Sequence, residues 1–425
     1  SPNYKISDMV NGTVTTRLIS TDGELPTRIH FSDDGYSAGR SIITCDYLNT
    51  SNCTSLDMLF YACGSYLTSV NMTGWDTSKV TGLYYAFYST HQLTEIIGIE
   101  DIDTSSLVKA HGMFNVTPKL TTLDLSKWDV SKLQVLSKAF SGCGATTINI
   151  STWNTCSATT MENMFDGCAL TELDVSHLNT SNVTNLTNMF ANVKISSIDL
   201  SGWDVRKVQQ TRLMFNSGSI TEIKLDGWNT ESLTDMWAMF CGSGIATVDI
   251  NHFNVSKVTN ASQLFDQCRN LVSVDMSNLH FTSCQSIANM FSRCPKLTTV
   301  KMADFTGSPI TAINGICYQS GALTEIDLTT VDVSRVTNMS NAFEWATSLK
   351  TLDLSTWDTR KATMTNAMFQ GWNNTQTVYY EPPFWSIGTT TLNSNINWVI
   401  NVTRNNGYWL DMTGITGATE ITLFN

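Results

Sequence analysis

The sequence has few charged residues and no long apolar run. Charged residues make up only 15% of the chain, so most of its surface must be neutral. No stretch reaches about 18 consecutive apolar residues, so we expect no membrane insertion. The formal net charge is -12. It argues against nucleic acid or an anionic membrane as a partner, because both attract a basic surface.

The sequence also lacks the short motifs that mark catalytic and cofactor sites. It contains no HExxH, no glycine-rich phosphate loop and no zinc-ligand spacing, and its six histidines are scattered. One GxSxG string, Gly35-Tyr36-Ser37-Ala38-Gly39, resembles a serine hydrolase motif. That motif works only between a strand and a helix, with a histidine and an acid behind it. Here Asp33-Asp34-Gly35 reads as a hairpin turn. We therefore expect no enzyme, no cofactor and no metal.

Cysteine is present in an odd number, 11, and no CxxC pair occurs. Five cysteines each lie three residues after a recurring phenylalanine: Cys63, Cys143, Cys168, Cys268 and Cys294. They are interpreted as small apolar core residues. Disulfides from Cys143 to Cys168 and from Cys268 to Cys294 are the alternative, because adjacent parallel strands lie about 4.8 Å apart. The odd count favours reduced thiols.

A repeat of 25–27 residues organises most of the chain. Its anchors are Phe60, Phe87, Phe114, Phe140, Phe165, Phe190, Phe215, Phe240, Phe265, Phe291, Phe343 and Phe369, with Cys317 in the same position once. Methionines often precede the anchor, as at Met113, Met164, Met189, Met214, Met239, Met290 and Met368, and we interpret them as core filling. Thirteen anchors at so regular a spacing indicate about 13 tandem units.

Each unit has three parts. The first alternates apolar and polar residues, as in 120–125, which predicts a strand with one buried face. A corner follows whose aromatic residue is expected to plug the core, as at Trp75, Trp128, Trp153, Trp203, Trp228 and Trp357. The third part, such as 183–190, has apolar residues at i, i+3, i+6 and i+7, which predicts a short helix.

An Asp or Asn directly follows the corner residue, at Asp129, Asn179, Asp204, Asn229, Asn254 and Asp358. Such side chains accept hydrogen bonds from backbone N–H groups just ahead. Ser181 and Ser256 are expected to cap the helix that follows. A ladder of calcium sites is a weaker alternative, because each corner supplies one carboxylate at most.

Stacked units of this kind predict an α/β repeat solenoid, with a parallel strand ladder, short helices or turns, and a cap at each end. The expected domains are an N-terminal cap (residues 1–50), a leucine-rich-repeat-like solenoid (51–375) and an aromatic-rich C-terminal β cap or attachment module (376–425). The segment 397–402 is rich in β-forming residues and predicts a strand.

Residues 52 to 375 resemble the BspA-like leucine-rich repeat surface proteins, whose unit reads roughly LxxLDLSxWDTSxVTNMxxMFxxC. The matching phrases include Leu123-Asp-Leu-Ser-Lys-Trp128-Asp-Val-Ser and Met161-Glu-Asn-Met164-Phe165-Asp-Gly-Cys168. The resemblance implies a solenoid displayed outside the cell that takes part in adhesion, with no shared catalytic residues.

The outward face of the strands is the first candidate binding site. It comprises Glu172, Asp174, Asp199, Glu222, Lys224, Asp249, Asp275, Lys301, Glu325, Asp327 and Asp353. A mostly acidic ladder is complementary to a basic partner, although a solvated sheet face is the simpler explanation. The second candidate is a platform for sugars or for attachment, formed by Tyr379, Tyr380, Trp385, Trp398 and Trp409. A capping module with a buried aromatic core is the simpler explanation there.

The function expected from these observations is that of a non-catalytic adhesion protein, extracellular and at the cell surface or secreted. It would bind a protein or glycan ligand on a host cell, a neighbouring cell or the matrix, with possible self-assembly through the C-terminal module. The alternative is a structural or receptor-binding component of a phage virion or of an extracellular assembly.

Overall fold

The structure is a computed structural model that describes residues 9–10, 13–14, 44–46, 49–63, 67–373, 375–380, 396–402 and 418–423. The chain forms two compact units, Ser1–Thr155 and Cys156–Asn425. Each unit consists of coils stacked in parallel, and together they contain about twelve turns. The expected parallel strand ladder is confirmed.

The strands of the N-terminal unit are short. β3 (Thr44–Asp46), β4 (Ser69–Asn71) and β5 (Glu95–Ile97) form one parallel sheet, and β6 (Thr122–Asp124) pairs with β7 (Thr147–Asn149). A small antiparallel pair, β1 (Met9–Val10) and β2 (Thr13–Val14), precedes them. β3 falls within the predicted cap, yet its parallel pairing with β4 shows that the ladder already includes Thr44.

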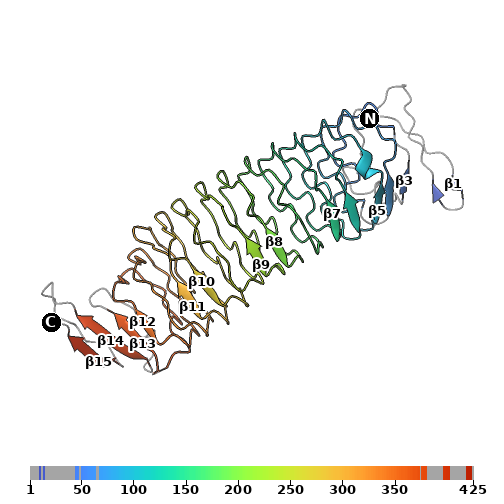
Figure 1. Cartoon of the computed structure of the whole chain (residues 1–425). Helices are drawn as coiled ribbons and strands as arrows, with labels where there is room; N and C mark the ends of the chain where they lie inside the picture. The colour runs from blue at the N-terminus through green and yellow to red at the C-terminus, as the bar shows by residue number, and fades with distance from the viewer. Residues whose placement is uncertain are drawn as a thin grey trace. The chain divides into compact units, whose positions relative to one another are not determined.

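In the C-terminal unit, β8 (Ser197–Asp199) pairs with β9 (Glu222–Lys224), and β10 (Ser273–Asp275) pairs with β11 (Thr299–Lys301). β12 (Thr351–Asp353), β13 (Thr377–Tyr380), β14 (Asn397–Val402) and β15 (Ala418–Leu423) form a four-stranded sheet in that order. These strands lie along one side of the stacked coils (Figure 1). β14 confirms the strand predicted at 397–402 and continues the ladder in parallel with β13.

Each of the three-residue strands β4 to β12 turns its central residue inward and its two flanking residues outward. In β6, for example, Leu123 is buried while Thr122 and Asp124 are exposed. This alternation explains why the period-two pattern of apolar residues in the sequence predicted strands with one buried face.

The corner tryptophans plug the core as expected. All six are buried, and Trp128, Trp153 and Trp203 are each at most 3% exposed. Five of the six indole N–H groups, all but that of Trp75, donate a hydrogen bond to a backbone carbonyl of the preceding coil. Trp153 Nε1 donates to the Leu125 carbonyl of the preceding coil at 3.0 Å, and Trp203 Nε1 donates to that of Val175 at 2.9 Å. The corner therefore buries a large side chain and satisfies a strand-end carbonyl at the same time.

The repeat phenylalanines stack upon one another inside each unit. Ring centroids are 5.9 Å apart for Phe190 and Phe215, and 5.6 Å apart for Phe215 and Phe240. The methionines that precede them are fully buried, so their assignment to the core is confirmed. These rings pack against rings of neighbouring coils, so a single coil cannot form this part of the core alone.

The predicted short helices are wrong. The residues after each corner form consecutive turns that alternate between two kinds of hydrogen bond. Leu186 N and Phe190 N donate to the next coil, to Gln210 O and Met214 O, whereas Met189 N donates within its own coil to Leu186 O. Asn188 has a φ of 55°, a left-handed conformation that an α-helix excludes. Among the described residues, one 3₁₀ turn, η2 (Ile99–Asp101), is the only helical element.

Candidate binding surfaces

The eleven residues of the predicted strand face all belong to the C-terminal unit, where they form two parallel columns. Glu172, Glu222 and Glu325 lie in the column at the start of the strands, and the aspartates and lysines lie in the column at the strand ends. All are exposed except Asp275, which is half-buried. The structure therefore brings the predicted residues together on one face.

Two lysines interrupt this acidic face and pair with the aspartates of the preceding coil. Lys224 Nζ lies 3.7 Å from Asp199 Oδ2, and Lys301 Nζ lies 2.7 Å from Asp275 Oδ2. Asp327 and Asp353 have no ion pair within the described chain. With nine carboxylates and two lysines, the face carries a formal charge of 2 − 9 = −7.

The strand-end aspartates have a second role that the sequence analysis missed. Asp174 Oδ1 accepts the backbone N–H of Ser176 at 3.0 Å and the Ser176 hydroxyl at 2.7 Å. The same pattern recurs with Asp199 and Ser201, and in the N-terminal unit Asn149 takes the place of aspartate. One carboxylate oxygen thus closes the turn out of the strand. The other oxygen, Oδ2, pairs with a lysine of the next coil at Asp199 and Asp275.

These hydrogen bonds lower the pKa of several strand-end carboxyls. The Ser176 hydroxyl and then its backbone N–H depress the pKa of Asp174. Lys301, followed by Ser277, lowers the pKa of Asp275 to about 2. The causes are hydrogen bonds to the charged form, so these carboxyls remain ionised in mildly acidic solution.

The corner Asp and Asn residues bond as predicted. Asn179 Oδ1 accepts the backbone N–H of Ser181 at 3.1 Å, and Asp204 Oδ1 accepts that of Arg206 at 3.2 Å. The Ser181 hydroxyl does not cap a helix, because no helix follows; it donates to Asn179 Oδ1 at 2.7 Å.

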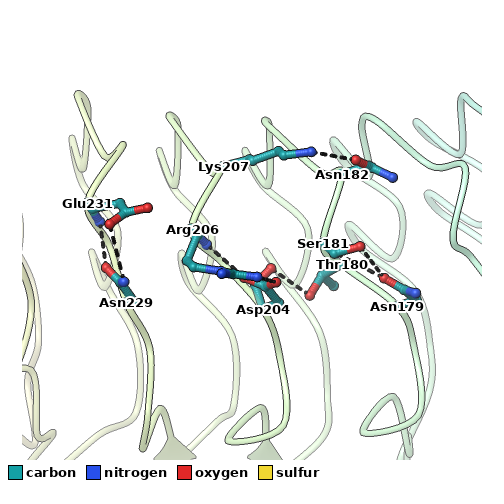
Figure 2. A network of polar contacts seen from close by, with 9 residues as sticks. All are labelled: Asn179, Thr180, Ser181, Asn182, Asp204, Arg206, Lys207, Asn229 and Glu231. Atoms are coloured by element: carbon teal, nitrogen blue, oxygen red, sulfur yellow. Dashed lines mark hydrogen bonds and ion pairs between the residues drawn. The ribbon is translucent and has the colours of Figure 1, made fainter.

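Further bonds run between neighbouring corners, as Figure 2 shows for residues 179–207. Thr180 Oγ1 donates to Asp204 O at 3.0 Å, and Lys207 Nζ donates to Asn182 Oδ1 at 2.7 Å. Most groups in this network bond to other protein groups, so we assign it a structural role. No cluster of three or more His, Cys, Asp or Glu suited to a metal ion occurs in the part of the chain described.

The recurring cysteines are buried thiols that act as hydrogen-bond donors. Cys268 Sγ donates to Phe240 O and Cys294 Sγ donates to Phe265 O, both at 3.0 Å. At the same position in the next coil, Ser320 Oγ donates to Phe291 O at 2.5 Å. Cys268 and Cys294 are therefore not joined by the disulfide that the sequence left open. Burial raises the pKa of Cys268 to about 12.

Two of the five residues predicted to form the aromatic platform are buried. Tyr380 is 3% exposed and Trp398 is 1% exposed. The Trp398 ring packs edge-on against Phe369, with centroids 5.4 Å apart. These two side chains form a core that covers the last coil and offer no face to a sugar. Tyr379 is half-buried, while Trp385, Trp409 and the serine of the GxSxG string, Ser37, lie outside the described residues.

The sequence analysis also missed an aromatic cluster in the N-terminal unit. Its members are Tyr61, Tyr84, Tyr85, Tyr88 and His111. Each member stands three residues before, two residues before or one residue after the anchor phenylalanine of its coil. In the Phe140 coil, the first and the last of these positions hold Ser137 and Ser141. Aromatic residues in place of such polar ones were the feature of the sequence that could have revealed the cluster.

One family profile matches most of the repeat. The family is described as "Mycoplasma protein of unknown function, DUF285", and it matches residues 40–148, 134–247, 194–305 and 286–379. The chain belongs to this family. The DUF285 repeat is the BspA-like leucine-rich unit expected from the sequence, so that resemblance is confirmed.

Solved structures with the same kind of repeat are only distantly similar. A leucine-rich cell surface protein from Faecalibacterium prausnitzii A2-165 is 15% identical over 78% of this chain and 77% of its own, with a TM-score of 0.36. A leucine-rich repeat protein from Bacteroides ovatus ATCC 8483 is 14% identical over 93% of this chain and 98% of its own, also at 0.36. Curated protein sequences gave no match. No helix in the described parts of the chain is long and apolar enough to cross a membrane.

Proposed function

We propose that this DUF285 protein is a non-catalytic binding protein, displayed outside the cell, whose solenoid recognises a protein on another cell or in the matrix. The acidic strand face of the C-terminal unit is the contact surface, and its partner is basic. The observation that carries this proposal is the column of exposed carboxylates at Asp249, Asp327 and Asp353, in each of which one oxygen closes a turn.

Two features support a binding role for this face. Its backbone is fixed by inter-coil pairing, so presenting it to a partner costs little conformational entropy. Its strand-end column repeats at the strand spacing of about 4.8 Å and holds six aspartates and two lysines, which gives a linear array with a net negative charge. Such an array steers and orients a partner of opposite charge. The virion or assembly role stays a prediction, because no observation favours it over a binding role.

The test is a binding screen of the whole chain against purified extracellular-matrix and cell-surface proteins of known charge, alongside a glycan array. Saturable binding to basic proteins that weakens with added salt supports the proposal. Binding confined to glycans, or to acidic and basic proteins alike, contradicts it.

A further inference from the structure

We propose that the N-terminal unit carries a second contact surface, a tyrosine cluster beside Asp57 that binds an arginine- or lysine-bearing segment of a partner protein. The tyrosine cluster is Tyr61, Tyr84, Tyr85, Tyr88 and His111, and all five side chains are half-buried. This inference rests on the proposed binding function but concerns different residues in a different unit.

Tyr85 lies at the centre of the cluster. Its ring centroid is 4.5 Å from that of Tyr84, 4.9 Å from that of Tyr88 and 6.1 Å from that of Tyr61, with edge-to-face geometry in each case. Its hydroxyl lies 3.1 Å from His111 Nε2. Around it, Tyr61 stacks on Tyr88 at 4.9 Å and Tyr84 stacks on His111 at 5.3 Å. The rings support one another, so a ligand meets an ordered surface.

Two glycines make this arrangement possible. A Cβ atom at Gly112 would lie 2.2 Å from Tyr85 Cε1, so the Tyr85 ring covers the backbone of the next coil only because that residue is glycine. A Cβ atom at Gly82 would lie 2.4 Å from Asp57 Oδ1. Tyr85 itself has a φ of 51°, the left-handed conformation that the repeat also adopts at the same position at Met58 and Asn188.

Asp57 supplies the charge at the edge of the cluster. Its Oδ1 accepts the backbone N–H of Tyr84 at 2.8 Å, which fixes the carboxylate against the coil that carries Tyr84, Tyr85 and Tyr88. No Lys, Arg or His side chain forms an ion pair with Asp57 within the described residues. Asp57 stands three residues before Phe60, the position that Tyr84 holds in the next coil. A carboxylate without a counter-ion in this column attracts a guanidinium or ammonium group. The ring faces and the carboxylate both favour a cation.

The C-terminal unit contains an internal example of the same contact. Trp237 stands three residues before Phe240, the position that Tyr84 and His111 occupy in their own coils. The guanidinium carbon of Arg212 lies 5.0 Å from the centroid of the Trp237 ring. At this position of the repeat, an aromatic side chain therefore accepts an arginine of the same chain. In the N-terminal unit a partner would supply the cation.

A protein segment fits the cluster better than a sugar does. Stacking covers one face of Tyr61 and Tyr88 and one face of Tyr84 and His111, so the cluster lacks the broad open platform on which a sugar ring stacks. The faces that remain suit a small cationic group, and tyrosine rings with their hydroxyl groups are typical of protein-binding surfaces.

The test uses the whole chain and fluorescein-labelled 12-residue peptides on a glycine–serine background, with two arginines or two lysines at every spacing. Each peptide has a matched copy in which neutral citrulline or norleucine replaces the charged residue. Fluorescence anisotropy should show saturable binding of a subset of the cationic peptides. We expect the matched neutral copies to bind at least about fivefold more weakly.

Three variants locate the contact. Asp57→Asn retains the acceptor for Tyr84 N–H but removes the charge, and we expect about a fivefold loss of affinity. The double variant Tyr61→Ser/Tyr88→Ser and the variant Gly112→Ala should each cause a comparable loss. Asp129→Asn, at an exposed corner of the same unit where Asp129 Oδ1 accepts the Ser131 N–H at 2.9 Å, is the matched control and should leave peptide binding unchanged.

Equal binding of charged and neutral peptides, or wild-type affinity in Asp57→Asn, overturns the inference. So does a library in which no cationic peptide binds. If the tyrosine variants instead lose binding on a glycan array, the surface is a sugar site and the inference is wrong. None of these results tests the acidic strand face. Its proposed binding depends on Asp249, Asp327 and Asp353 and is measured in a separate experiment.

Discussion

Lys301 Nζ lies 2.7 Å from Asp275 Oδ2, one coil away, at a point where β10 and β11 pair the two residues directly. The remaining oxygen of Asp275 accepts the backbone N–H of Ser277 at 3.0 Å. One side chain thus joins two coils and closes a turn. A repeat protein with few charged residues can thus use one carboxylate for two structural contacts.

Acid should weaken this interaction in a defined pH window. The pKa of Asp275 is about 2 in the folded chain, below the value of about 3.9 expected when unfolded. Its contribution to stability is therefore complete above about pH 4 and is lost as the pH falls towards 2. Lys301→Met removes the main cause of the shift. Urea denaturation from pH 7 to pH 2 should show the variant less stable than wild type at pH 7 and similar to it at pH 2. Parallel curves would contradict this account.

The turn role of the strand-end aspartates predicts that amide and alanine substitutions differ. Asp353 Oδ1 accepts the Ser355 N–H at 2.9 Å, and Asn149 makes the equivalent bond in the N-terminal unit. Asp353→Asn should leave the free energy of unfolding within about 0.5 kcal/mol of wild type, whereas Asp353→Ala should lose about 1 kcal/mol. Urea denaturation at neutral pH measures both variants. Equal losses would show that the carboxylate does not support the turn.

The stacked phenylalanines predict that loss of one ring lowers the free energy of unfolding strongly. Phe240 is fully buried and stacks on Phe215 at 5.6 Å and on Phe265 at 5.4 Å. Phe240→Ala should cost about 3–5 kcal/mol. Hydrogen exchange should accelerate first in the coils on either side, because each coil relies on its neighbours. Phe240→Leu is the control and should cost less. A uniform rise in exchange across the unit would contradict the nearest-neighbour account.

The buried thiols predict slow chemistry in the folded state. Burial raises the pKa of the Cys268 thiol to about 12 and raises that of Cys294 as well, so little thiolate exists at neutral pH. A thiol reagent at pH 8 should label both residues only after unfolding. Cys294→Ser should be better tolerated than Cys294→Ala, because a hydroxyl can still donate to Phe265 O, as Ser320 does to Phe291 O. Rapid labelling of folded protein would contradict this assignment.

The strands, the corners and the core could be predicted because each recurs at a fixed position. Leu123, Trp128 and Phe140 occupy sites that are apolar in almost every unit, and repetition separates such sites from chance. The helix prediction failed because apolar spacings of three and four residues also fit a series of turns. The deciding bonds, such as that from Leu186 N to Gln210 O, join residues 24 positions apart, and no pattern within one unit reveals them.

The candidate surfaces could be predicted only in part, for the same reason. The acidic column followed from the strand alternation, but the turn that occupies Asp174 Oδ1 did not. The tyrosine cluster requires the register of three successive coils, since Tyr61, Tyr85 and His111 each come from a different one. Burial of Trp398 depends on how the last coil is covered, which composition alone does not specify.

The most direct test of the binding account compares wild type with the triple variant Asp249→Asn/Asp327→Asn/Asp353→Asn against the basic proteins captured in the screen. Asparagine preserves the turns, so the two proteins should unfold at the same urea concentration. We predict that the triple variant binds at least about tenfold more weakly and that its affinity depends less on salt. Unchanged affinity in a normally folded triple variant would contradict the proposal that the acidic strand face is the binding surface.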